Sequence, residues 1–194
     1  DMNKIAFVVV RYGKDINGGA EFHCKMLAER LVGKYQVEVL TTCVKNYVTG
    51  DNEFPEGEED INGVIVRRFK AAPINKEKIY SYMRGAKRAR KLRKFLYQTY
   101  LLPLVSLFCP IWTYRRKYEI NALNSNVFYS PALFSFIKEH KKEYRAIIPI
   151  SLDYPQVYYT ALYAPERTLV IPTMHYHSVS FRSILTNVFT KVAY

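Results

Sequence analysis

A pair of glycines, Gly18 and Gly19, stands between an apolar segment and a segment with helical spacing, an arrangement suited to anion binding. Residues 5–10 form an unbroken apolar run rich in β-branched side chains, which is typical of a parallel strand buried on both faces. A helix that begins just after such a strand presents unpaired backbone N–H groups to a phosphate. Asn17 is the expected N-cap. The candidate phosphate-binding loop is therefore Asn17, Gly18, Gly19 and Ala20, although the glycines could also serve only a tight turn.

Polar and aromatic residues follow the other expected strand ends. In open α/β sheets, ligands bind beyond the carboxyl ends of the strands. The candidates there are Tyr12, Asp153, Tyr154, His175 and His177, as possible contacts of an acceptor. His175 is expected to hydrogen-bond a substrate hydroxyl, whereas a structural role is expected for His177. Asp153 could act as a general base or could cap the next helix.

No metal or cofactor site is expected. His175 and His177 alternate and would point the same way in an extended segment, but no third zinc ligand accompanies them. The cysteines, Cys24, Cys43 and Cys109, lack metal spacing and fit a reducing compartment. The G-x-G-x-x-G dinucleotide fingerprint and the phosphate loop ending in Gly-Lys-Ser/Thr are both absent. The first residues already belong to the expected strand and leave no room for a signal peptide, so a cytoplasmic location is expected.

The apolar runs predict the elements that carry these residues. Strands are expected at residues 5–10, 35–43, 64–69, 146–151 and 168–173, and helices at 20–31, 130–140, 155–164 and from 178 onward. The polar segment 45–63 lacks a convincing helix and is either an irregular crossover or a local hairpin. Pro149 is expected at a bulge or a strand end. The pattern predicts one α/β domain over residues 1–194: a Rossmann-like, doubly wound, mainly parallel sheet with flanking helices and a basic, apolar helical insertion.

The insertion, residues 76–118, has a strongly basic character. Its cations include Arg84, Lys87, Arg88, Lys91, Lys94, Arg115 and Arg116, and they flank the uncharged segment 95–114. Prolines and polar residues dilute that segment, so a transmembrane helix is not expected. We predict instead an interfacial segment with Trp112 at the depth of the lipid headgroups. The alternative is a pair of ordinary core helices with a solvated basic face.

The formal charge of +12 and the aromatic content of 15% suit a nucleic-acid binder as well as a membrane-associated protein. A nucleic-acid surface would interleave cations with stacking aromatics, whereas here the cations precede an uncharged, leucine-rich run. Drawn as one helix, the insertion has an apolar face through Tyr97, Tyr100 and Leu104, which Arg93 interrupts. An anionic membrane surface is therefore the expected partner, rather than nucleic acid.

Taken in order, several short motifs resemble the amino-terminal half of retaining glycosyltransferases of family 4, which have the GT-B fold. The motifs are the opening strand, GGAE at Gly18 to Glu21, CKMLAERL, VEVLTTC, NEFPEGEEDINGVIVRRF, the YSPAL helix start and PTMH after the last expected strand. The resemblance implies that this half binds the acceptor and that Gly18 and Gly19 approach the donor phosphates across an interdomain cleft. It also implies that His175 contacts the transferred sugar, although Tyr176 and His177 stand where acidic residues often follow that histidine.

The same resemblance implies what the chain works with. The family binds its nucleotide-sugar donor mainly through a second Rossmann-like domain with paired glutamates, so we expect one domain of a longer enzyme, inactive by itself. The reaction needs no metal and retains the sugar configuration without an obvious protein nucleophile. The basic insertion suits a lipid-linked or cell-envelope glycan acceptor at the inner face of the cell membrane. Two alternatives are a non-enzymatic nucleotide- or nucleic-acid-binding module and a cofactor-dependent Rossmann enzyme.

Overall fold

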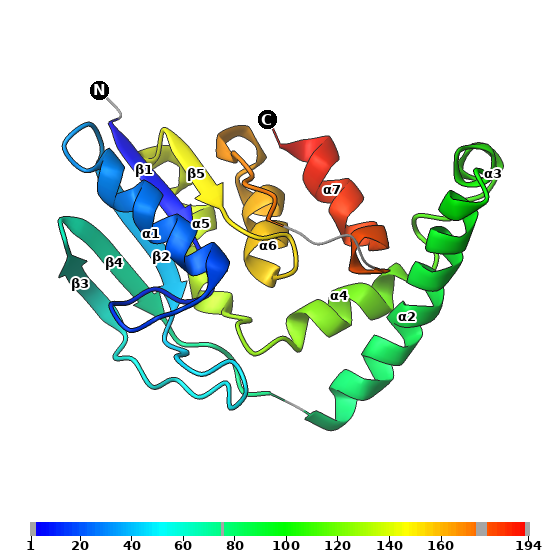
Figure 1. Cartoon of the computed structure of the whole chain (residues 1–194), viewed down its shortest axis with the longest axis horizontal. Helices are drawn as coiled ribbons and strands as arrows, with labels where there is room; N and C mark the ends of the chain where they lie inside the picture. Colours follow the sequence, from blue (N-terminus) through cyan, green and yellow to red (C-terminus); the bar gives the residue numbers. More distant parts are fainter. Residues whose placement is uncertain (1–2, 75, 174–177, 193–194) are drawn as a thin grey trace.

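The computed structural model describes residues 3–74, 76–173 and 178–192, and it shows a five-stranded sheet with helices on both faces (Figure 1). The strands are β1 (Lys4–Val8), β2 (Gln36–Thr42), β3 (Gly57–Ile61), β4 (Val64–Phe69) and β5 (Ala146–Pro149), in the spatial order β3-β4-β2-β1-β5. The helices are α1 (Gly19–Leu31), α2 (Lys76–Gln98), α3 (Leu102–Phe108), α4 (Arg116–Asn124), α5 (Pro131–His140), α6 (Pro155–Tyr163) and α7 (Ser183–Lys191). All strand pairs are parallel except β3 with β4, which confirms the expected α/β class.

Each face of the sheet has its own helical cover. Phe7 of β1 lies in one cluster with Cys24 and Ala28, two residues of the apolar stripe predicted for α1. Val8, the next residue along the strand, belongs to the opposite cluster, to which α5, α6 and α7 contribute buried residues. Successive side chains of a strand point to opposite faces, so β1 is buried on both sides, as its unbroken apolar run predicts.

The polar segment after β2 ends in a hairpin, which decides between the two alternatives left open by the sequence. β3 pairs antiparallel with β4 through the turn Asn62-Gly63, where both residues have positive φ, 56° and 81°. This is the backbone that a two-residue hairpin turn requires, and an Asn-Gly pair adopts it readily. Acidic side chains of β3 bind cations of β4: Glu58 lies 2.6 Å from Arg67 and Glu59 lies 2.5 Å from Arg68.

The expected strand at residues 168–173 is wrong. Thr168 and Ile171 form only isolated parallel bridges, with Ile147 and Ile150 respectively. Ile171 donates its N–H to the carbonyl of Pro149 at 3.1 Å, but Pro149 has no N–H to donate in return. The ladder is therefore interrupted where the proline faces it, and Pro149 closes β5, as expected of a strand-end proline.

The insertion folds as three helices rather than as one amphipathic helix. The expected face through Tyr97, Tyr100 and Leu104 is wrong because α2 ends at Gln98 and Tyr100 adopts a left-handed conformation with φ 59°. α3 lies at the end of α2 that is farthest from the sheet, and α4 returns along α2 toward it (Figure 1). α4 approaches α2 closely where a side chain at Gly85 would collide with the ring of Tyr118.

A buried ion pair joins these helices to the body of the protein. Arg93, which the helical pattern places as an interruption of an apolar face, is fully buried and donates to Glu119 of α4 at 2.9 Å. Its other N–H groups donate to the carbonyls of Ile111 and Tyr114, and Nη1 also donates to Phe181. The second oxygen of Glu119 accepts from the backbone N–H of Ser183 at 2.6 Å, at the start of α7.

Replacing Arg93 by alanine should destabilise the protein by about 3–5 kcal/mol, because the Glu119 carboxylate would remain buried without its counter-charge. Arg93→Ala is expected to lower the urea midpoint of unfolding strongly, followed by circular dichroism. The matched control is Lys91→Ala on the exposed side of the same helix, for which little change is expected. Equal midpoints for the two variants would show that the pair does not hold α2 in place.

Candidate functional site

The segments that follow four strands meet in one apolar cluster at the carboxyl edge of the sheet. Val10 follows β1, Val44 follows β2 and Ala71 follows β4, and the three residues are buried together with Phe128. Tyr154, which follows β5, meets the Phe128 ring edge-on, with ring centroids 5.4 Å apart. The loops that could carry a ligand site are therefore supported by a common packed layer.

The first turn of α1 already holds a carboxylate of its own. The N-cap is Gly18, rather than the expected Asn17, and it makes no side-chain cap hydrogen bond. The Glu21 carboxylate folds back over Gly18, so a β-carbon at Gly18 would collide with it. Arg11 donates to Glu21 Oε1 from Nε at 3.0 Å and from Nη2 at 2.6 Å. The Glu21 carboxylate thus occupies part of the amino-terminal end of α1, where the helix dipole would otherwise favour a phosphate.

Gly19 is the open side of this turn. Apart from its chain neighbours and the backbone of α1, no described heavy atom lies within 4 Å of a β-carbon built at Gly19. Asn17 and Gly19 are exposed, and Ala20 is half-buried. A phosphate could therefore approach the start of α1 along Gly19, beside the Glu21 carboxylate.

Tyr12 and Tyr154 are neutral groups at physiological pH. Burial raises the pKa of the Tyr12 phenol, and burial is also the main cause of the raised pKa of Tyr154, ahead of the negative charges of Glu21 and Asp153. The Tyr12 hydroxyl is buried and has no hydrogen-bond partner among the described residues. Tyr12 is buried in the core cluster beneath α1 with Cys24 and Ala28, so the expectation that it contacts a ligand is wrong. Tyr154 is half-buried and can donate a hydrogen bond to a ligand, but it is a poor candidate for a general base.

Replacing Tyr12 by phenylalanine should make the protein more resistant to alkaline unfolding. Because the pKa of Tyr12 is raised on folding, its neutral form stabilises the fold up to the unfolded pKa of about 10, and this contribution is lost as the pH rises further. The loss approaches about 1.4 kcal/mol per pH unit for one tyrosine. At neutral pH the urea midpoint of Tyr12→Phe should equal or exceed that of the wild type, because the substitution removes a buried hydroxyl without a partner, and the difference should widen above about pH 10. The control is exposed Tyr47, whose Tyr47→Phe variant should follow the wild type; parallel curves for all three would contradict the prediction.

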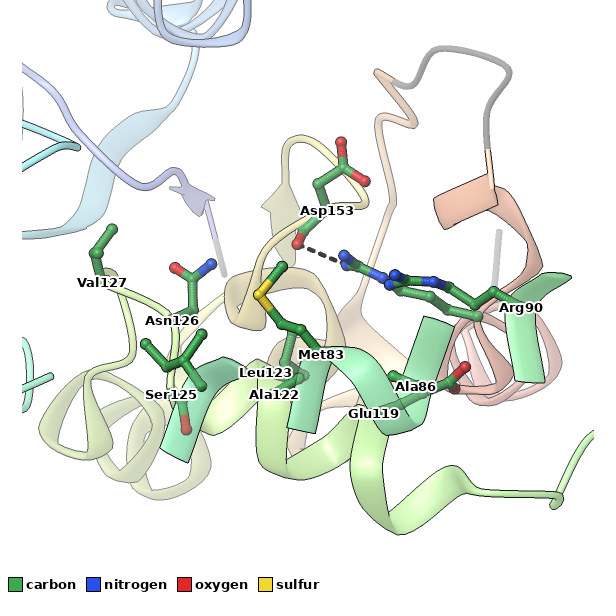
Figure 2. A pocket seen from close by; sticks show the side chains of 12 residues that line it. Met83, Ala86, Arg90, Glu119, Ala122, Leu123, Ser125, Asn126, Val127 and Asp153 are labelled. Carbon is green, nitrogen blue, oxygen red and sulfur yellow. Dashed lines mark hydrogen bonds between the residues drawn. The ribbon is translucent and has the colours of Figure 1, made fainter. Parts of the chain in front are cut away.

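A cavity of about 200 Å³ lies between α2, α4 and the loop after β5 (Figure 2). Met83 and Leu123 contribute to its apolar wall, and Arg90, Arg182 and Asp153 to its polar side. We call this cavity the α2–α4 pocket. Val127 lines the pocket and also packs against the apolar cluster beneath Tyr154, so the pocket adjoins the carboxyl edge of the sheet.

The polar side of the α2–α4 pocket brings two arginines, Arg90 and Arg182, together with the carboxylates of Glu119 and Asp153. Arg182 Nη1 donates to the backbone carbonyl of Asp153 at 3.0 Å, the bond drawn in Figure 2. Arg90 Nε is buried without a hydrogen-bond partner among the described residues. Burial lowers the pKa of both guanidinium groups, and the charge of Arg90 lowers that of Arg182 further. Of these residues, the sequence predicted only Asp153 as a site residue. The spacing of Arg90 from Ala86 places the two on one helix face, but this is a weak signal for a binding site. Nothing in the sequence connects Arg90 with Arg182.

The remaining predicted residues of the edge have different outcomes. Asp153 does not cap α6, because the N-cap is Tyr154 and no side-chain cap bond forms there. His175 and His177 lie outside the described residues, so their predicted roles stay predictions. Within the part of the chain that the structure describes, no group of three or more His, Cys, Asp or Glu side chains could hold a metal ion.

A second candidate surface lies on α2 and α3. Four predicted cations of α2 are exposed, and three apolar side chains of α3 are mostly exposed, Leu104 at 55%, Leu107 at 79% and Phe108 at 80%. We call these seven residues the α2–α3 surface: Arg84, Lys87, Arg88, Lys91, Leu104, Leu107 and Phe108. No helix among the described residues has both the length and the apolar character needed to cross a bilayer.

The other cations and the tryptophan of the insertion are less accessible. Trp112 is half-buried, and its ring lies 5.5 Å from the guanidinium carbon of buried Arg93. Arg115 is half-buried and lies over the rings of Tyr114 and Tyr118, and Arg116 and Lys94 are half-buried as well. These residues are partly packed inside the insertion. For Trp112 this differs from the sequence-based prediction, which places its side chain at the depth of the lipid headgroups.

Comparison with protein-family models, with curated proteins and with solved structures finds no match to this chain.

Proposed function

We propose that this chain is the acceptor-side domain of a retaining glycosyltransferase with the GT-B fold. In this proposal the enzyme transfers a sugar from a nucleotide-sugar donor to a lipid-linked or cell-envelope glycan acceptor at a membrane surface. The observation that carries the proposal is that α2 has two roles. Some of its residues line the α2–α4 pocket, and others are exposed cations on the side of the helix that continues to α3. An acceptor held at a membrane would reach the carboxyl edge of the sheet along this helix.

The strand order supports a ligand site at the same edge. The chain passes from β1 to β2 on one side of β1, whereas β5 lies on the other side. Ligands of open α/β sheets bind at this kind of switch point, beyond the carboxyl ends of the strands. The loops there carry Gly18 and Gly19 after β1, and Asp153 and Tyr154 after β5. In the proposal, Gly19 faces the donor phosphates, a second domain binds most of the nucleotide sugar, and His175 contacts the transferred sugar.

The α2–α3 surface supports the membrane part of the proposal. Each Lys or Arg held near an anionic bilayer contributes about 1 kcal/mol, and exposed apolar side chains beside them add burial in the interface. Leu107 and Phe108 are too exposed to contribute much to the packing of the described fold. We propose that α3 enters the headgroup region while the cations of α2 bind anionic lipids.

The chain should bind anionic vesicles through the α2–α3 surface. We expect flotation with vesicles of phosphatidylcholine and phosphatidylglycerol, weakened by salt because the cations are exposed. The triple variant Leu104→Ser, Leu107→Ser, Phe108→Ser should lose most of this binding. Removing one cation, as in Lys87→Gln, should weaken binding about fivefold, the equivalent of about 1 kcal/mol.

The matched control is Tyr47→Ser with Val48→Ser, two exposed apolar side chains outside the α2–α3 surface. This double variant should float like the wild type. Flotation that survives the triple α3 substitution would contradict the membrane proposal. Tight binding to single-stranded DNA with a steep salt dependence would instead favour the nucleic-acid-binding alternative.

A bulky side chain at Gly19 should block catalysis without unfolding the domain. Gly19→Leu meets no atom near its β-carbon, and leucine is a better helix former than glycine, so the thermal midpoint should be unchanged or slightly raised. In the enzyme that contains the donor-binding domain, transfer of labelled sugar from UDP-glucose, UDP-galactose or GDP-mannose to membrane lipid should fall at least about tenfold, a loss of about 1.4 kcal/mol in transition-state stabilisation.

The control for this experiment is Lys34→Leu, an exposed position just before β2 at the opposite edge of the sheet. It should retain full transfer. Wild-type transfer by Gly19→Leu would remove the glycine turn from the donor site. The same assay with His175→Ala tests the role that the resemblance assigns to that histidine.

A further inference from the structure

Two arginines on the wall of the α2–α4 pocket have donors that the protein does not use. A guanidinium carries five N–H donors. Among the described residues, Arg182 donates one hydrogen bond, to the carbonyl of Asp153, and Arg90 donates none, although its Nε is buried. A buried donor without a partner, such as Arg90 Nε, costs free energy, and the remaining donors of the two half-buried arginines are free of described partners, so a ligand with several acceptor oxygens would be stabilised here.

The carboxylates around the pocket offset only part of the positive charge of these arginines: Glu119 favours the charged form of Arg90, and Asp153 and Glu119 favour that of Arg182. Both oxygens of Glu119 are engaged, one by Arg93 and the other by Ser183. The Asp153 side chain points away from Arg90, and one of its oxygens is itself buried without a partner (Figure 2). The charge of Glu119 is balanced by Arg93, so the guanidinium groups of Arg90 and Arg182 share one remaining carboxylate, Asp153. The pocket therefore favours an anion.

The rest of the pocket is apolar. Ile79, Met83, Leu123 and Val127 face the same cavity as the arginines. A water molecule takes about 30 Å³, so a cavity of about 200 Å³ has room for more than an inorganic ion. An anionic group with a carbon chain or ring attached would satisfy both sides.

We propose that the α2–α4 pocket binds the phosphate group of a phosphate ester, held by Arg90 and Arg182, with the organic part of the ester on Met83 and Leu123. Phosphate is preferred over carboxylate because it offers more acceptor oxygens to two planar guanidinium forks. The ester has two possible sources, a lipid-borne phosphate reached along α2 or a free phosphorylated molecule. The inference deepens the proposed function, since it gives the acceptor a phosphate, but its test does not involve sugar transfer.

The test is calorimetric titration of the chain with inorganic phosphate and with hexyl phosphate at constant ionic strength. Arg90→Gln and Arg182→Gln should each weaken binding of hexyl phosphate at least tenfold. The matched control is Arg145→Gln, an exposed arginine just before β5 and outside the α2–α3 surface, which should bind within twofold of the wild type. Arg90→Gln removes no hydrogen bond to a described residue, so its thermal midpoint should be unchanged or higher, which separates loss of a ligand contact from loss of fold.

The two probes distinguish the sources. Much tighter binding of hexyl phosphate than of inorganic phosphate, lost in Arg90→Gln, supports a lipid-borne ester. Equal binding of the two probes, again lost in Arg90→Gln, supports a free phosphorylated molecule with a polar organic part and overturns the placement of that part on Met83 and Leu123. Binding that is unchanged in Arg90→Gln, or no binding of either probe to the wild type, overturns the inference. Neither of these results would alter vesicle binding through α3, so the failure of this inference and that of the proposed function are distinguishable.

Discussion

The candidate site depends on the buried ion pair between Arg93 and Glu119. α2 and α3 extend away from the sheet (Figure 1), and this pair fixes α2 against α4 and the start of α7. Burying two charges is costly, and the attraction between them offsets that cost only when the remaining donors and acceptors are also satisfied. The carbonyls of Ile111 and Tyr114 and the backbone N–H of Ser183 meet this condition. A firmly held α2 can then carry exposed and half-buried cations that the fold itself does not need.

Arg90 and Arg93 show the difference between a structural and a functional arginine on one helix face. The two residues are three positions apart, so they project from neighbouring turns of α2. Arg93 donates to Glu119 and to three backbone carbonyls, and the fold explains it completely. Arg90 has a lowered pKa, caused first by burial, and no hydrogen bond to a described residue. Arg90 is half-buried and its Nε has no acceptor among the described residues, which costs free energy, so in the proposal above a ligand supplies that acceptor.

The sheet was predictable from the sequence because apolar runs report burial directly, as β1 and the stripe of α1 show. The strand at 168–173 was not, because the pattern of its own side chains cannot reveal that Pro149 opposite lacks a donor. Helical periodicity places Arg93 as an interruption of an apolar face because the pattern assigns every arginine to solvent, whereas its partners lie far along the chain. Likewise Asn17 matched the N-cap preference, but Glu21 folds back on Gly18 instead. Local sequence preferences therefore predicted the helices and strands. The pocket could not be predicted in this way, because it is formed by tertiary contacts between α2, α4 and the segment at Arg182.

The distribution of ion pairs shows where the unpaired part of the net charge of +12 lies. The cations of the sheet are matched: Arg67 and Arg68 bind carboxylates of β3, and Lys4 lies 2.7 Å from Glu38. Among the described residues, no ion pair forms at the exposed cations of α2, such as Lys87 and Arg88. The excess charge thus gathers on one helix, whose field would attract an anionic surface to its outer side. Because the inner side of that helix forms the wall of the α2–α4 pocket, a ligand carried by such a surface would arrive next to its own binding groups.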